Sequence, residues 1–150
     1  MKFVPFEIAK KLKEKGFSCE MPFAMYNEIA AFHLLTTSAP YHVCESGYKY
    51  REYYNYEDFD EHDYVAPTIS QVLEWLRNDK FFHVSPDLMS DYTEDADGNI
   101  CEEWTYWSYS IHHIIDGVLY RDYNQFDHIE YQSWEEAALA GIEYVLDNLI

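Results

Sequence analysis

Residues 104–115 read WTYWSYSIHHII, Asp116-Gly117 follows, and residues 118–123 read VLYRDY. Both runs are rich in aromatic and β-branched side chains, the types that β-strands favour. Asp-Gly is a preferred sequence for two-residue hairpin turns, because both positions need a positive φ. This stretch therefore predicts two antiparallel strands joined by a tight turn.

A third strand is predicted just before this hairpin. Residues 81–89 read FFHVSPDLM, and Pro86 places the strand at a sheet edge or bulge because proline cannot donate to the ladder. Residues 95–99, DADGN, have the composition of a turn. We expect a small antiparallel sheet, a three-stranded meander within residues 81–126.

A helix is predicted on each side of the meander. Thr68 with Gln71, and Ser133 with Glu136, match the capping box, in which two side chains satisfy backbone N–H groups at a helix start. Apolar residues recur at helical spacing after both caps.

The last helix has one apolar face, made by Trp134, Ala138, Gly141, Ile142, Val145 and Leu149. We expect Trp134 and Ile142 to be buried against the sheet. The C-terminal part thus reads helix-β-β-β-helix, which predicts an α+β fold, and the length of the chain suits one domain over residues 1–150.

The N-terminal half has a weaker pattern. Residues 5–17 predict a helix that ends at Gly16, a preferred C-terminal cap. Residues 21–35 are apolar enough for a strand followed by a short helix over Asn27 to Leu35. The acid-rich residues 57–63 predict an exposed loop.

Charge is the most unusual feature of the chain. The formal net charge is -18. Residues 81–150 carry 15 acidic side chains and one basic one, Arg121. Nucleic-acid binding rests on Lys and Arg, so we expect no direct contact with DNA or RNA. A surface of this sign favours a basic protein as the partner.

Several features predict a cytoplasmic protein that does not act at a membrane. No apolar run approaches the ~20 residues of a spanning helix, and the lysine-rich N-terminal segment lacks the apolar region of a signal peptide. Cys19, Cys44 and Cys101 are far apart and form no CxxC pair, so neither a disulfide framework nor a zinc site is predicted.

Few residues suggest a metal site or catalysis. His112 and His113 are adjacent on a predicted strand and must point to opposite faces, while His83 on the neighbouring strand could pair with one of them. Asp95 and Asp97 begin like a calcium loop, but the pattern fits a β-turn better because the sixth and twelfth positions are Ile100 and Tyr106. We expect no metal and no cofactor, and we identify no catalytic residue.

The aromatic strand has two distinct faces. Alternation puts Trp107, Tyr109 and Ile111 on one face, which we expect to be the core. The other face is half polar and includes Trp104 and Tyr106.

One predicted hairpin gathers acids near its tip. The candidate binding residues are Asp91, Glu94, Asp95, Asp97, Glu102 and Glu103. A turn projects from its sheet, so these carboxylates should be exposed and able to enter a basic groove. The alternative is that they only keep the hairpin soluble and protect the sheet from edge pairing.

Four segments together resemble a known group of proteins. They are PFEIAKKLKEKGF at 5–17, APTISQVLEWLR at 66–77, WSYSI at 107–111 and YQSWEEAALAGIEYVL at 131–146. The chain resembles an uncharacterised family of small proteins from gut Bacteroidetes and their phages and prophages. This resemblance implies a mobile-element, cytosolic context and carries no catalytic residue with it.

These patterns favour a non-enzymatic protein-interaction protein of phage or mobile-element origin. Two alternatives stay open. One is an acidic DNA mimic that inhibits a nucleic-acid-binding protein, since carboxylates can stand in for phosphates. The other is a small cation-dependent enzyme or binder that uses the histidine and carboxylate groups.

Overall fold

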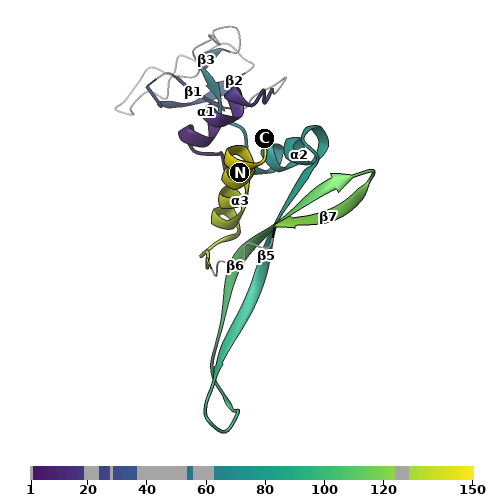
Figure 1. The fold of residues 1–150 in the computed structure, drawn as a ribbon. Coiled ribbons are helices and arrows are strands. Elements are labelled where there is room, and N and C mark those ends of the chain that lie inside the picture. The colour runs from purple at the N-terminus through teal and green to yellow at the C-terminus, as the bar shows by residue number, and fades with distance from the viewer. Residues whose placement is uncertain (1, 19–23, 28, 37–53, 56–62, 124–128) are drawn as a thin grey trace, which may run out of the picture. The chain divides into compact units, whose positions relative to one another are not determined.

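The computed structural model of the 150-residue chain describes residues 2–18, 24–27, 29–36, 54–55, 63–123 and 129–150 (Figure 1). The chain divides into two compact units, Met1–Thr68 and Ile69–Ile150. Most of the acidic loop expected at 57–63 lies outside the described residues, and its last residue, Asp63, is buried.

The first unit begins with the predicted helix, α1 (Phe6–Glu14). Pro5 is its N-cap, and Ile8, Ala9 and Leu12 are its buried residues. Gly16 follows with a φ of +81°, a conformation that glycine adopts without steric penalty. The N–H of Phe17 then donates to the carbonyl of Leu12 at 2.9 Å, which closes the helix end.

A small sheet completes this unit, with the order β3-β2-β1-β4. Its strands are β1 (Ala24–Tyr26), β2 (Phe32–Thr36), β3 (Tyr54–Asn55) and β4 (Tyr64–Val65). β1 pairs antiparallel with β2 and β4, and β2 pairs parallel with β3. The ring of Phe6 on α1 makes edge contacts with Tyr26 and Tyr64, so aromatic side chains join the helix to this sheet.

The short helix predicted over Asn27 to Leu35 is wrong, because Phe32 to Leu35 belong to the strand β2. The Asn27 side-chain oxygen accepts the N–H groups of Ile29 at 3.2 Å and Ala31 at 2.8 Å. Ala30 takes a φ of +61° in the same turn. Asparagine side chains compete with helical hydrogen bonds in this way, and here the chain reverses into a hairpin.

The second unit has the predicted order of helix, meander and helix, which confirms the α+β class. Its elements are α2 (Ile69–Asp79), β5 (Phe82–Glu94), β6 (Ile100–Ile115), β7 (Val118–Tyr123) and α3 (Trp134–Asn148). The sheet order is β5-β6-β7, and both pairings are antiparallel. β5 continues five residues past Met89, where the expected strand ended, and β6 begins before Trp104.

Pro86 lies in the edge strand β5, opposite Tyr109, as its chemistry requires. The N–H of Ile114 donates to the carbonyl of Phe81 at 2.7 Å, so these two residues form a hydrogen-bonded pair. Hydrogen-bonded and non-hydrogen-bonded pairs alternate along an antiparallel ladder. By that alternation, the even-numbered residues of β5 are at non-hydrogen-bonded positions. Proline at position 86 therefore removes no ladder bond and leaves one donor fewer on the outer edge.

The capping pattern at Ser133 is confirmed. The Ser133 hydroxyl accepts the N–H of Glu136 at 3.2 Å, and the Glu136 carboxylate accepts the N–H of Gln132 at 2.9 Å. Ile142 is fully buried as expected, whereas Trp134 is only half-buried. α3 approaches the sheet closely at Gly141. Trp134 is the first residue of the helix, two turns before that point, and is therefore less covered.

Gly141 sets the distance between α3 and the sheet. A Cβ atom at this position would lie 2.5 Å from Cγ1 of Val84 and 3.1 Å from Cδ2 of Tyr109. Real Cβ atoms do not approach that closely, so the helix fits here only because residue 141 has no side chain.

We expect Gly141→Ala to destabilise the protein. The clash should cost about 1–3 kcal/mol, which exceeds the gain of about 1 kcal/mol from better helix propensity. Urea denaturation measures the change. Adding Val84→Ala removes the clashing methyl group, so the two substitutions should show a favourable coupling of about 1 kcal/mol or more. Strictly additive effects would show that the close approach does not constrain α3.

Candidate functional site

The sheet of the second unit has two unlike faces. Val84, Tyr109 and Ile111 share the face against α3, as the contacts of Gly141 and the register show. Ile111 is buried, and burial, with Tyr131 and Tyr144 nearby, raises the pKa of Tyr109 to about 12. The core face expected for Tyr109 and Ile111 is confirmed.

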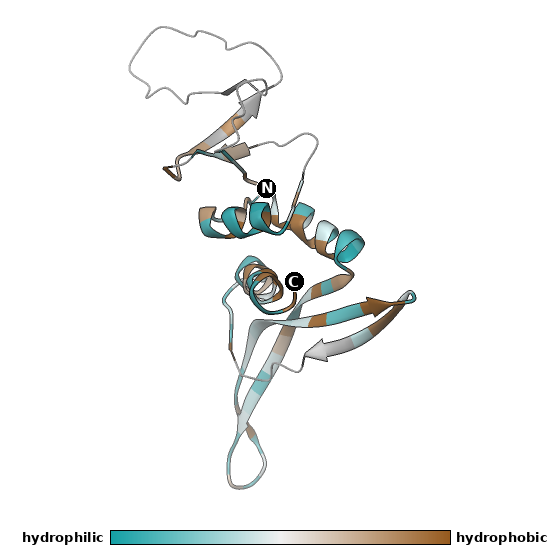
Figure 2. Ribbon diagram, turned by 45° about the horizontal axis from the view of Figure 1, so that its top comes forward, coloured by the Kyte–Doolittle hydropathy of each residue, from teal (hydrophilic) through white to brown (hydrophobic). Residues whose placement is uncertain are grey.

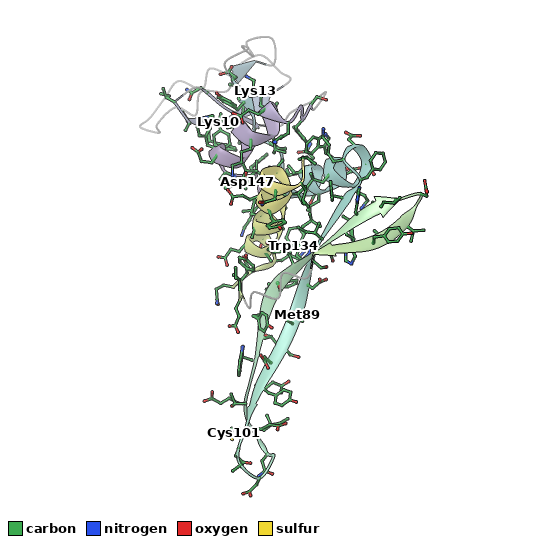
Figure 3. The ribbon with its side chains drawn as sticks, in the orientation of Figure 1. Lys10, Lys13, Met89, Cys101, Trp134 and Asp147 are labelled. Carbon is green, nitrogen blue, oxygen red and sulfur yellow. The ribbon has the colours of Figure 1, made fainter. Side chains whose placement is uncertain are left out.

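Past this core the sheet narrows to a two-stranded hairpin, which we call the acidic arm (residues 88–107). The N–H and carbonyl of Trp107 both bond to Tyr131 at 2.9 Å, and this bridge marks the base of the arm. β5 and β6 continue past it as a pair, away from α3 (Figure 1). Figure 3 shows Met89 partway along the arm and Cys101 near its tip.

The acidic arm carries all six acids singled out in the sequence. Residues 88–103 are all exposed, and they include Asp91, Glu94, Asp95, Asp97, Glu102 and Glu103. The arm has no lysine or arginine, so these carboxylates have no balancing charge within it. The tip is correspondingly hydrophilic in Figure 2.

Asp95 organises the tip. Its carboxylate accepts the N–H groups of Asp97 and Asn99, both at 2.9 Å, and the Asn99 side-chain amide. Gly98, with a φ of +82°, donates its N–H to the Asp95 carbonyl. The β-turn interpretation of this stretch is confirmed. The bond from the Asn99 side chain, supported by backbone N–H groups, lowers the pKa of Asp95.

Exposed apolar side chains lie between the acids of the arm. Leu88 and Ile100 are 59% and 62% exposed, and Met89 and Tyr92 are exposed as well. Trp104, by contrast, is held through its indole N–H, which donates to the Glu130 carboxylate at 3.1 Å.

A second group of polar residues lies on the sheet face opposite the core. It joins Arg77 of α2, His83 of β5 and His112 of β6, and we call it the arginine–histidine cluster. His83 and His112 are directly opposite in the ladder, with ring centroids 6.2 Å apart. The pairing of His83 with one of the two adjacent histidines is thus confirmed for His112. His113 instead stacks on Phe82 at 4.7 Å.

Arg77 fixes the protonation of His83. Its Nε and Nη2 atoms lie 3.2 and 2.8 Å from Nδ1 of His83. A guanidinium can only donate, so Nδ1 must be the acceptor and the proton of the neutral ring is on Nε2. Burial, followed by the charges of Arg77 and His112, lowers the pKa of His83, and the charge of Asp87 acts in the opposite direction.

Sequence reasoning missed Arg77, because its position depends on one backbone angle. Only two residues connect α2 to β5, and Phe81 takes a φ of +62° there. This conformation is uncommon outside glycine, and it folds the strand back beside the last turn of the helix.

Asp87 continues the polar face toward the arm. Its two carboxylate oxygens accept hydrogen bonds from the hydroxyls of Ser85 at 2.9 Å and Ser110 at 2.8 Å. Ser110 is buried, so these hydroxyls replace the water that the carboxylate loses.

Among the described residues, no group of three or more His, Cys, Asp or Glu side chains could hold a metal ion. Cys101 is a free, exposed thiol. In the described part of the chain, no helix is long and apolar enough to cross a membrane. Comparisons with protein-family models, with curated proteins and with solved structures find no match to this chain.

We expect His83 to titrate below pH 6.5, its unperturbed pKa. Because the pKa of His83 is lower in the folded state, His83 contributes to the free energy of unfolding above pH 6.5. This contribution is lost as the pH falls through the folded pKa. Arg77→Gln should move the midpoint upward without restoring it fully, because burial remains. A pH titration of the imidazole signals by NMR measures both midpoints, and an unchanged midpoint in the variant would contradict the assigned hydrogen bond.

Proposed function

We propose that this protein acts by binding a basic protein partner, and that the acidic arm is the binding element. The observation that carries this proposal is a two-stranded hairpin that is exposed throughout residues 88–103 and bears acids without a single base. The proposed setting is the host cytoplasm, and the resemblance to phage and prophage proteins suggests a mobile-element origin.

The charge of the arm supports a basic partner. Six carboxylates on one hairpin produce a field that attracts a positive surface and speeds the encounter. The same field repels a second copy of this chain, so pairing of two arms is disfavoured. Nucleic acid is disfavoured for the same reason.

The apolar side chains of the arm support docking rather than solubilisation alone. An arm that only kept the protein soluble would have no use for Leu88 or Ile100, which are more than half exposed. Apolar anchors inside a charged rim are the usual composition of a protein interface. We therefore expect the partner to offer apolar pockets within a basic surface.

The arrangement of the acids favours this function over mimicry of DNA. A mimic needs carboxylates in two rows that follow the two phosphate strands. Strand alternation and the register put Asp91 and Glu102 on one face of the arm and Glu103 on the other, so these carboxylates do not form two rows on one shared surface.

Charge neutralisation tests the proposal. The arm variant replaces Asp91 with Asn and Glu94, Glu102 and Glu103 with Gln, which leaves the Asp95 turn intact. The control variant neutralises four exposed acids outside the arm, with Gln at Glu7, Glu14 and Glu74 and Asn at Asp79. Partners are captured from host lysate with the wild-type protein and both variants, and association rates with the recovered protein are measured against salt.

We expect the control variant to capture the same basic partner as the wild type, while the arm variant loses most of it. The association rate of the wild type should fall steeply as salt rises to physiological levels, where charges are screened over about 8 Å. Equal capture by the folded arm variant would show that the acids only keep the hairpin soluble.

A further inference from the structure

We propose that the arginine–histidine cluster is a binding site for a small tetrahedral oxyanion, phosphate or sulfate, either free or as a monoester. Arg77, His83 and His112 form this site on the sheet face opposite α3. It is separate from the acidic arm and does not depend on the function proposed for it.

Arg77 has an unusual hydrogen-bond partner for an arginine in so acidic a chain. The chain has 28 acidic residues, yet no carboxylate of a described residue forms an ion pair with this guanidinium. Arg77 donates instead to a neutral imidazole nitrogen, although its planar fork matches the oxygens of a phosphate far better. An exposed arginine with a weak acceptor in so acidic a protein is available to an anion.

The histidines beside Arg77 supply further hydrogen-bonding groups for an anion. With Nδ1 of His83 accepting from Arg77, the Nε2–H of His83 is a further donor. His112 lies across the ladder from it, and Nδ1 of His112 is buried without a hydrogen-bond partner. A buried polar atom without a partner calls for an explanation.

The remaining arginine of the second unit belongs to the neighbouring strand, β7. The second unit contains three basic residues, and Arg121 of β7 is directly opposite His112 in the register. The ladder is irregular at this point, because β7 has one extra residue between its partners of Ile111 and His112. Such bulges are common beside functional sites. Both arginines of the unit thus belong to elements that meet at the histidine pair.

The charges around the site favour a small anion and make its binding depend on pH. The charge of His112 opposes protonation of His83, and the charge of Asp87 favours it, although two serine hydroxyls already bond the Asp87 carboxylate oxygens. An anion that accepts the hydrogen bonds of the Arg77 guanidinium in place of His83 leaves Nδ1 of His83 free to accept a proton. Anion binding and protonation of His83 should therefore strengthen each other. A nucleic acid would also have to approach the acidic arm, whereas a single small dianion does not.

The test is an NMR titration of the histidine rings in sodium sulfate and in sodium chloride of equal ionic strength. Sulfate does not change its charge over the pH range in which histidine titrates. A change in the His83 midpoint therefore reflects the imidazole and not protonation of the ligand. We expect sulfate to raise the midpoint of His83 by about half a unit or more, and to shift the signals of His112. Glycerol phosphate in place of sulfate shows whether a monoester binds better than the free ion.

Two variants make the result specific. Arg77→Gln should abolish the difference between sulfate and chloride, whereas Lys80→Gln should preserve it. Lys80 is a suitable control because it is only three residues away and contacts the Trp75 ring, not the cluster. Equal His83 midpoints in the two salts, or a difference that persists in Arg77→Gln, would overturn the proposal.

Discussion

The antiparallel ladder between β5 and β6 is the interaction on which the second unit depends. It runs from Phe82 opposite His113 to Glu94 opposite Ile100, with one irregularity near the tip. The backbone N–H and C=O groups of each strand form hydrogen bonds with the other strand. Pairing can therefore continue where side chains no longer form a core. One ladder thus supplies both the buried base that α3 covers and the exposed acidic arm.

The ladder also explains how two unrelated sites can share one sheet. Successive side chains point to opposite faces, which allows Val84 to pack on α3 while His83 meets Arg77 on the other side. Further along, the same alternation gives the arm acids on both faces with apolar side chains between them. A basic protein at the arm and a small oxyanion at the cluster would therefore be bound independently.

The sign and position of charge were readable from the sequence, and they carry most of the functional argument. An exposed, base-free hairpin attracts positive charge and repels negative charge, and that holds whatever its exact geometry. The cluster was only partly readable. Strand alternation predicted that His83 could meet one of the two adjacent histidines, but nothing in the sequence pointed to Arg77.

The sequence by itself determined the features that depend on neighbouring residues: the strands around 104–123, the Asp116-Gly117 turn, the Ser133 cap and the edge position of Pro86. Tertiary structure decided the rest. β5 extends to Glu94 because hydrogen bonds from β6 outweigh the poor strand propensity of its acidic end. Asn27 turned an expected helix into a hairpin, and the backbone of Phe81 brought Arg77 to His83. These outcomes depend on partners distant in the chain or on one rare backbone angle, and local composition encodes neither.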